Sequence, residues 1–195
     1  MWVKICGMTT PVAVAAALEA GADAIGFVFA ESVRRVSPQV AKRLAAPARG
    51  HMTCVAVIRH ATQQELERIL AEFAPDVLQA DWTSLARLAV PRELEVLAVV
   101  RAGHELPDPP PARVLFEGPV SGTGVPCDWS RARAFARATE LVLAGGLNAG
   151  NVAEAIRAVR PFGVDVSSGV EEKPGLKSAS EINRFVDAAR QEYTS

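Results

Sequence analysis

The chain has 195 residues, of which 49% are hydrophobic and 22% are charged, a balance typical of a folded globular protein and not of a disordered one. Its 21 basic and 22 acidic residues leave a formal net charge of −1, which excludes a basic field for nucleic acid or for an anionic membrane surface. The length predicts one domain over residues 1–195, because domains cluster at roughly 100–200 residues.

Three cysteines stand at unrelated spacings, at Cys6, Cys54 and Cys127. The odd count predicts neither a disulfide framework nor a zinc site and fits a reducing compartment. The first residues have neither the basic start nor the long apolar core of a signal peptide, and no apolar run reaches the roughly 18 residues of a membrane span. We therefore expect a cytoplasmic protein that does not interact with membranes.

Short apolar runs of the kind found in strands alternate with longer helical stretches along the chain. In chain order we expect strand 3–5, helix 12–20, strand 24–29, helix 37–44, strand 53–58, helix 62–73, strand 77–79, helix 84–89, strand 95–100, strand 114–116, a helix from Asp128 or Ser130 to 138, strand 141–144, a helix from Asn148 or Asn151 to 159, strand 164–166 and helix 180–191. Two helix starts carry clear signals, because Ser37 precedes a proline and Thr62 forms a capping box with Glu65.

Eight strands that alternate with helices at a repeat of about 24 residues predict an α/β fold, a compact (β/α)8 TIM barrel. A doubly wound open sheet also alternates strand and helix, but it usually has about five or six strands. Residues 101–113 contain four prolines, and a proline inside a helix removes a hydrogen bond and clashes with the preceding turn. We therefore expect the fifth helix to be missing or vestigial.

The loops after the last three expected strands predict a phosphate site, because the reactive groups of a TIM barrel lie at the carboxyl ends of its strands. Glycines there let the backbone approach an anion, and serines add hydroxyl donors. The alternative is that the glycines form turns and the serines bond to local backbone. The predicted phosphate-binding residues are Gly122, Gly124, Gly145, Gly146, Asn148, Ser167, Ser168 and Gly169.

Cys6 directly follows the first expected strand. A lone cysteine at such a position is more often a small buried hydrophobe, and we expect Cys54 and Cys127 to be packing residues of this kind. Strand alternation puts Lys4 and Cys6 on one face, however, and a neighbouring cation favours the thiolate.

Five motifs along the chain occur in an order that resembles a single protein family. They are residues 3–9 (VKICGMT), 22–29 (ADAIGFVF), 32–38 (SVRRVSP), 143–148 (LAGGLN) and 165–171 (DVSSGVE), the last followed by Pro174-Gly175. Together they resemble the strand ends and loops of the phosphoribosylanthranilate isomerase family of tryptophan biosynthesis. The resemblance covers most of the chain and implies a (β/α)8 barrel.

The resemblance implies an Amadori rearrangement of N-(5'-phosphoribosyl)anthranilate into 1-(o-carboxyphenylamino)-1-deoxyribulose 5-phosphate. This reaction needs one general acid and one general base, and it needs no metal and no organic cofactor. The implied partner is thus a small phosphosugar–anthranilate substrate and not a nucleic acid or a membrane. We expect a monomer or a weak homodimer.

The resemblance also implies the roles of individual residues. Cys6 is the implied general base, and we hypothesise that Lys4, together with a nearby helix dipole, lowers the pKa of its thiol. The family usually ends strand six with an aspartate acid; the aligned residue here is Glu117, which we expect to be the general acid. Asp128 is the rival carboxylate, but its place before a helix predicts an N-cap.

Two more residues are implied in substrate binding beside Lys4. Arg34 matches an arginine that contacts the anthranilate carboxylate, with Arg35 as the alternative, and Asp165 matches a residue near the substrate amine or ribose hydroxyls. The chain departs from the family at residues 77–81, where a histidine is missing, and at Arg59-His60 after strand three.

Three other functions are compatible with a phosphate-binding barrel. An indoleglycerol-phosphate synthase would place catalytic lysines at inner strand ends, and Lys4 is the one candidate in the sequence. A histidine-pathway isomerase would have aspartates where this chain has Cys6 and Val100. A degenerate barrel would bind phosphate without catalysis, although the retained thiol and carboxyl groups argue against it.

Overall fold

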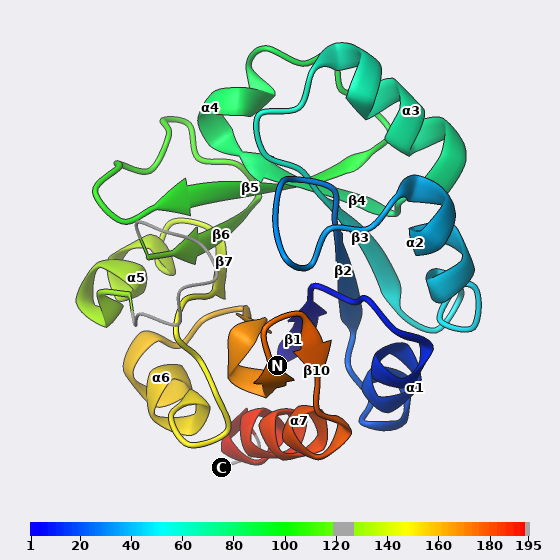
Figure 1. Ribbon diagram of the computed structural model, residues 1–195. Coiled ribbons are helices and arrows are strands. Elements are labelled where there is room, and N and C mark those ends of the chain that lie inside the picture. The colour runs from blue at the N-terminus through cyan, green and yellow to red at the C-terminus, as the bar shows by residue number, and fades with distance from the viewer. Residues whose placement is uncertain (119–126, 194–195) are drawn as a thin grey trace.

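The computed structural model describes residues 1–118 and 127–193, and it forms a closed barrel in which eight parallel strands follow one another in chain order (Figure 1). The strands are β1 (Trp2–Cys6), β2 (Ala24–Val28), β3 (Thr53–Val57), β4 (Val77–Asp81), β5 (Glu95–Arg101), β6 (Arg113–Glu117), β7 (Glu140–Leu143) and β8 (Gly163–Val166). The ring closes where β1 pairs with β8, with Lys4 opposite Asp165. The TIM-barrel prediction is confirmed.

Helices surround the strands on the outside of the ring (Figure 1). They are α1 (Pro11–Glu19), α2 (Pro38–Ala45), α3 (Gln63–Phe73), α4 (Trp82–Leu85), α5 (Trp129–Phe135), α6 (Val152–Val159) and α7 (Ala179–Tyr193). The predicted capping box of Thr62 and Glu65 is confirmed, and Asp128 is the N-cap of α5, accepting the N–H of Ser130 at 2.9 Å. In the two ranges that the structure covers, no helix has the length and apolar content needed to cross a bilayer.

The segment between β5 and β6 contains no helix in residues 102–112, as the prolines predicted, and Figure 1 shows it as a green loop beside β5. The helix expected at 84–89 was placed too late, because α4 is a single turn that begins directly after β4 at Trp82. The expected ends of four strands were too early. β1 runs on to Cys6, β4 to Asp81, β5 to Arg101 and β6 to Glu117, because pairing with the neighbouring strand continues past the apolar runs.

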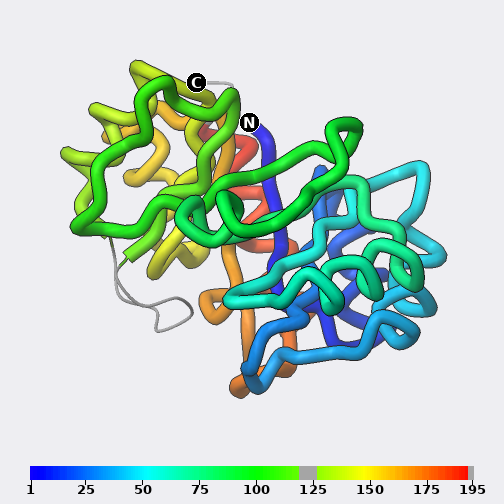
Figure 2. Tube along the Cα trace, turned by 90° about the horizontal axis from the view of Figure 1, so that it is seen from above, coloured from blue at the N-terminus to red at the C-terminus, as the bar shows by residue number. Residues whose placement is uncertain are grey.

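An unpredicted segment follows β8 at the carboxyl end of the barrel. It consists of a single 3-10 turn, η1 (Ser168–Val170), and a hairpin of β9 (Glu171–Lys173) and β10 (Leu176–Lys177). The hydroxyl of Thr9 donates to the carbonyl of Gly175 at 2.7 Å, which ties the hairpin to the loop after β1. Figure 2 shows the orange hairpin at one end of the barrel and the N-terminus, in blue, at the other.

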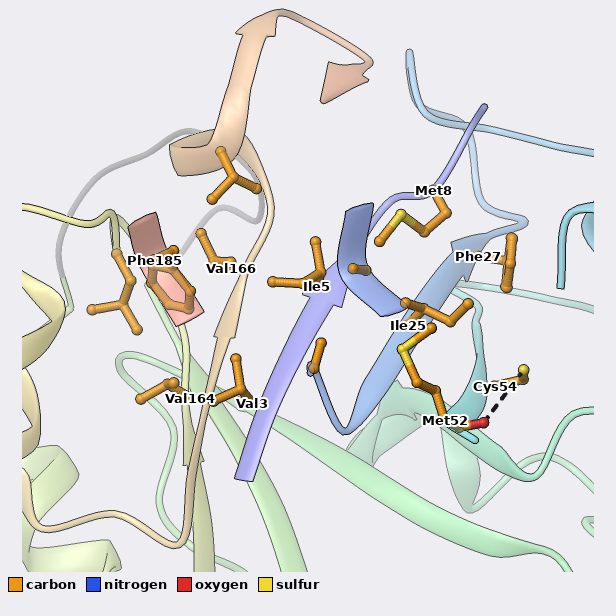
Figure 3. Packing of buried hydrophobic residues seen from close by; sticks show 14 of the residues in the cluster. Val3, Ile5, Met8, Ile25, Phe27, Met52, Cys54, Val164, Val166 and Phe185 are labelled. Carbon is orange, nitrogen blue, oxygen red and sulfur yellow. Dashed lines mark hydrogen bonds between the residues drawn. The ribbon is translucent and has the colours of Figure 1, made fainter. Parts of the chain in front are cut away.

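Both faces of the strands are buried, as the nearly continuous apolar strands require. On the outer face, Val3 of β1 and Val164 of β8 lie close together, and Ile5 and Val166 lie toward Phe185 of α7 (Figure 3). The buried inner cluster consists of Ala24, Val55, Val77, Leu97, Val99, Leu115, Val142 and Ala144.

Arg113 closes the amino end of the barrel, which we call the floor. Its Nη1 donates to Glu95 at 2.6 Å and its Nη2 donates to Glu140 at 2.8 Å. The guanidinium lies 4.4 Å from the ring centre of Phe162 and 5.9 Å from that of Trp2. Arg113 is thus held over the amino end of the barrel by two ion pairs and by cation–π contacts with two aromatic rings.

Candidate active site

Cys6 is the last residue of β1, and its sulfur lies beside Lys4 at the carboxyl end of the barrel. A Cβ built on Gly26 of β2 would be 2.9 Å from Cys6 Sγ and 3.2 Å from Lys4 Cε, so both side chains occupy the space that this glycine leaves. Lys4 is fully buried, and its Nζ donates to Oδ1 of Asp165 at 2.8 Å. The structure thus brings together Cys6, Lys4 and Asp165.

The protonation state of Cys6 depends on two opposing effects. Burial raises the pKa of the thiol above its ordinary value, and the charges of Lys4 and Lys177 act against that rise without overcoming it. Burial also opposes the charge on Lys4, but Asp165 and Cys6 outweigh it and raise the pKa of the ammonium group. Lys4 therefore remains a cation and favours the thiolate, but the expected net lowering of the thiol pKa is wrong, because burial outweighs the charge of Lys4.

A second group of charges lies next to Cys6, where the β9–β10 hairpin meets the barrel. Arg34 donates from Nε and Nη2 to the two oxygens of Glu171 at 2.7 and 2.8 Å. Lys177 donates to Glu171 at 2.8 Å and to the carbonyl of Ser167 at 2.9 Å. The hydroxyl of Ser167 in turn donates to the carbonyl of Cys6 at 3.1 Å. The hairpin therefore fixes both Arg34 and the backbone of the thiol.

Arg34 and Arg35 point to different places. The side chain of Arg34 is 12% exposed, and the charge of Cys6 contributes to raising the pKa of its guanidinium, after the leading contribution of the hydrogen bond to Glu171. Arg35 is exposed and lines a separate cavity of about 530 Å³ with Arg59 and Arg68. The arginine that lies at the thiol is Arg34.

The loops after β7 and β8 are locked against each other. Gly145 and Gly146 have left-handed backbones, with φ of 91° and 68°. A Cβ on Gly169 would overlap the backbone carbonyl of Leu147, so the two loops pack without a side chain between them. This arrangement brings five predicted phosphate residues to the same end of the barrel as Cys6: Gly145, Gly146, Ser167, Ser168 and Gly169.

What the structure shows is different for the three other predicted phosphate residues. The side-chain oxygen of Asn148 accepts the N–H of Gly150 at 2.8 Å, so this group stabilises a local turn. The helix begins later, at Val152 with Asn151 as its N-cap. Gly122 and Gly124 lie outside the described residues.

Glu117 ends β6 at the same rim, and its side chain is 13% exposed. Its Oε1 accepts a hydrogen bond from Nη1 of Arg101 at 2.7 Å, and Nε of Arg101 donates to Asp81 at 2.8 Å. Asp128 caps α5 through its Oδ1, and its hydrogen bond from Ser130 is the leading cause that lowers the pKa of its carboxyl. Of the two carboxyl groups, Glu117 is the one at a strand end.

Sequence reasoning missed Lys177, Glu171 and Arg101 as members of the site. Glu171 stood within a quoted motif, but its partners are 6 and 137 residues away, and no local spacing indicates them. In the covered ranges, no cluster of three or more His, Cys, Asp or Glu side chains could hold a metal ion.

Gly26→Ala tests the contact between β2 and the thiol. We expect kcat to fall by up to about 10²-fold, because the new methyl group displaces Cys6 Sγ, and displacements of about 1 Å have effects of this size. Steady-state kinetics measure kcat, and a thermal unfolding curve measures the stability of the same variant. Gly21→Ala is the control: it strains a left-handed turn with nothing within 4 Å of its Cβ, so it should cost stability and spare kcat. Unchanged kcat in Gly26→Ala would contradict the contact.

The Glu171 cluster predicts a loss of stability in acid. Burial alone would raise the pKa of Glu171, but hydrogen bonds from Arg34 and Lys177 outweigh it and lower the pKa to about 2. Because this folded-state value lies below the value of about 4.3 for an unfolded glutamate, the stability that Glu171 contributes is present above that pH and is lost as the pH falls toward 2.

Glu171→Gln should therefore reduce the free energy of unfolding at pH 6 and lose less of it between pH 4.5 and pH 2.5 than the parent protein does. Urea unfolding at several pH values measures this difference. Glu172→Gln, an exposed neighbour on the same hairpin, should leave the acid slope unchanged. If the free energy of unfolding falls equally with pH in the parent and in Glu171→Gln, the hydrogen bonds of Glu171 do not cause the loss of stability in acid.

Comparison with known proteins gives consistent matches over the whole chain. Residues 3–188 match the family described as N-(5'phosphoribosyl)anthranilate (PRA) isomerase. A protein of Rhizobium johnstonii named N-(5'-phosphoribosyl)anthranilate isomerase is 38% identical over 97% of this chain and 94% of its own length. A protein of Bradyrhizobium with the same name is 38% identical over 96% of this chain and 94% of its own length.

Solved structures agree in fold as well. The phosphoribosyl anthranilate isomerase of Thermotoga maritima is 31% identical with a TM-score of 0.83, covering 98% of this chain and 99% of its own. A second structure of such an isomerase, in complex with reduced 1-(o-carboxyphenylamino)-1-deoxyribulose 5-phosphate, is 30% identical with a TM-score of 0.79 and the same coverage.

Proposed function

The chain belongs to the N-(5'-phosphoribosyl)anthranilate isomerase family, and we propose that Cys6 is the general base and Glu117 the general acid of its reaction. It converts N-(5'-phosphoribosyl)anthranilate into 1-(o-carboxyphenylamino)-1-deoxyribulose 5-phosphate, an isomerisation in tryptophan biosynthesis. The observation that carries the assignment is that the thiol, with its Lys4–Asp165 pair, and the Glu117 carboxyl both end their strands at the rim that holds the phosphate loops.

In the proposed mechanism, Glu117 protonates the ring oxygen of the ribose, the bond from that oxygen to C1 breaks, and a protonated Schiff base forms. The Cys6 thiolate then removes the proton from C2, and the released electron pair forms the C1–C2 double bond of an enolamine. A proton added at C1 and one lost from the C2 hydroxyl complete the ketone. The raised pKa of the thiol makes the thiolate a stronger proton acceptor but a less populated form at neutral pH, and the charge of Lys4 acts to keep that form accessible.

We assign the substrate groups to the charges around the thiol. Glu171 occupies the Nε–Nη2 edge of Arg34, which orients the Nη1 end of the guanidinium for the anthranilate carboxylate. Asp165, fixed by Lys4, is assigned to the substrate amine or ribose hydroxyls. The paired loops after β7 and β8 are assigned to the phosphate.

Turnover of freshly made phosphoribosylanthranilate, followed as loss of its fluorescence, tests the assignment of the acid. Glu117→Gln keeps the shape of the side chain but removes its acidic proton, so kcat should fall by about 10²–10⁴-fold. Asp128→Asn is the control, since Asp128 caps α5, and it should retain nearly full activity. If Glu117→Gln is as active as the parent and Asp128→Asn is not, the acid is Asp128.

We also propose that residues 1–195 act as one catalytic domain in the cytoplasm, as a monomer or weak homodimer without a metal or organic cofactor. The assigned groups come from strands of a single closed barrel, which supports a site built within one chain. A structure of mutually generated monomers of the dimeric Thermotoga maritima isomerase is 29% identical with a TM-score of 0.78. Sedimentation over a range of protein concentrations, with activity measured in parallel, tests the oligomeric part of the proposal.

A further inference from the structure

Three neighbouring strands end in charged side chains that bond to one another. Asp81 is the last residue of β4, Arg101 of β5 and Glu117 of β6. Arg101 and Glu117 are directly opposite each other in the β5–β6 pairing, so their side chains leave the barrel wall on the same side. The three side chains are between 12% and 15% exposed, so solvent screens their charges only weakly.

The guanidinium of Arg101 is divided unequally between the two carboxylates. Its Nε donates to Oδ1 of Asp81 at 2.8 Å, and its Nη2 lies 2.7 Å from the same oxygen. Its Nη1 donates to Oε1 of Glu117 at 2.7 Å. Two of the three nitrogens therefore face Asp81, and the third fixes the direction of the Glu117 carboxyl.

This division has a chemical consequence for a general acid. An arginine devoted to one carboxyl group stabilises its ionised form and lowers its pKa by about 1–3 units. A general acid must hold its proton when the substrate arrives, so an undivided arginine would favour the wrong state of Glu117. Asp81 contacts two nitrogens of the guanidinium, so its negative charge offsets that of Arg101 at Glu117, and Arg101 can orient the acid without deprotonating it.

We propose that Arg101 is a positioning residue for Glu117, and that Asp81 shares the guanidinium so that Glu117 keeps its transferable proton while its Oε1 accepts from Arg101. The inference rests on the assignment of Glu117 as the general acid. It also gives a role to Asp81, which lies in the segment where the chain departs from the family motif.

The other titratable groups around this bridge do not reproduce its effect. Arg59, which is 46% exposed, approaches Asp81 with 3.9 Å between Nε and Oδ2, and His104 and Glu105 line the same cavity as Arg101. Cys127, which precedes the N-cap of α5, interacts with the charge of Glu117, and burial is the leading cause that raises the pKa of its thiol to about 11, so it is neutral. Arg101 is the cation that bonds to both carboxylates.

The test compares the pH dependence of kcat/KM in Asp81→Asn and Arg101→Gln. In Asp81→Asn the guanidinium charge acts on Glu117 alone. The limb of the kcat/KM pH profile that is set by Glu117 should therefore move to lower pH by about one unit, and kcat/KM at neutral pH should fall about tenfold. In Arg101→Gln the two carboxylates face each other without the cation, so the same limb moves to higher pH. The limb set by Cys6 stays in place in both variants.

Arg113→Gln is a matched control, because it removes a similar glutamate–arginine–glutamate bridge from the floor of the same barrel. Arg113→Gln should lower the unfolding temperature and leave both limbs of the kcat/KM pH profile where they are in the parent protein. Arg101→Lys keeps the charge but not the forked geometry, so it should keep the limb near its parental position while kcat falls. Arg101→Lys and Asp81→Asn also keep the proposal testable if Arg101→Gln does not fold.

The proposal is overturned if Asp81→Asn and the Arg101 variants change stability alone, as Arg113→Gln does. Glu117→Gln distinguishes this failure from a failure of the acid assignment. Full activity in Glu117→Gln overturns both proposals. Loss of activity in Glu117→Gln, together with unmoved limbs in Asp81→Asn and Arg101→Gln, overturns only the positioning role.

Discussion

Cys6→Ser should lower kcat for phosphoribosylanthranilate by about 10²–10⁴-fold while KM changes little. The substitution replaces the thiol by a hydroxyl of similar size, so Lys4 and Gly26 keep their neighbours. A serine hydroxyl stays protonated at neutral pH, however, and it cannot accept the C2 proton as a thiolate does. Steady-state kinetics by the fluorescence assay measure the loss, and circular dichroism confirms the fold.

Cys54 supplies the control for this experiment. It is fully buried on β3, beside Met52 and away from the rim, as Figure 3 shows. Burial raises the pKa of its thiol to about 11, so it is inert at neutral pH. Cys54→Ser should therefore cost stability without a comparable loss of kcat. Retention of most of the turnover in Cys6→Ser would refute the base assignment.

Lys4→Met should lower the free energy of unfolding by about 3–5 kcal/mol, the largest stability effect that we expect in this barrel. Lys4 is fully buried and Asp165 is 8% exposed, so the substitution leaves a carboxylate without its cation in a nearly dry interior. Activity should fall as well, because Lys4 opposes the rise in the pKa of Cys6. Urea unfolding and kinetics on one preparation measure both effects.

A double-mutant cycle isolates the Lys4–Asp165 pair from the loss of lysine packing. Asp165→Asn removes the charge but keeps the shape, so Lys4→Met combined with Asp165→Asn should be less destabilised than the sum of the two single variants. Additive effects in the cycle would show that the two charges do not depend on each other. Lys42→Met, on the surface of α2, serves as the reference for loss of an exposed lysine.

Local spacing predicted the barrel because its strands and helices are signalled by short-range patterns. Alternation along 3–5 put Lys4 and Cys6 on one face, and the Thr62–Glu65 spacing marked the start of α3. The four prolines of 107–111 excluded a helix between β5 and β6. Each of these signals depends on residues only a few positions apart, which is why the sequence carries them.

The ionic contacts of the site could not be predicted in the same way. Arg101 bonds to residues 20 and 16 positions away, and Lys177 reaches the rim only because the β9–β10 hairpin folds back over it. The apolar runs ended before Asp81, Arg101 and Glu117, and of these residues the sequence singled out only Glu117, as a strand-end acid. The three become neighbours because β4, β5 and β6 pair side by side, with Arg101 opposite Glu117.

The covered floor of the barrel has a consequence for isotope exchange. Beneath Cys6 lie the fully buried Lys4 and, further down, the stack of Arg113 on Trp2 and Phe162. A deuteron that the sulfur takes from C2 would therefore leave toward bulk water at the carboxyl end of the barrel, on the side where the substrate is proposed to bind. The rate at which deuterium appears in bulk water should then follow the rate of product release and not the rate of C2–H bond cleavage.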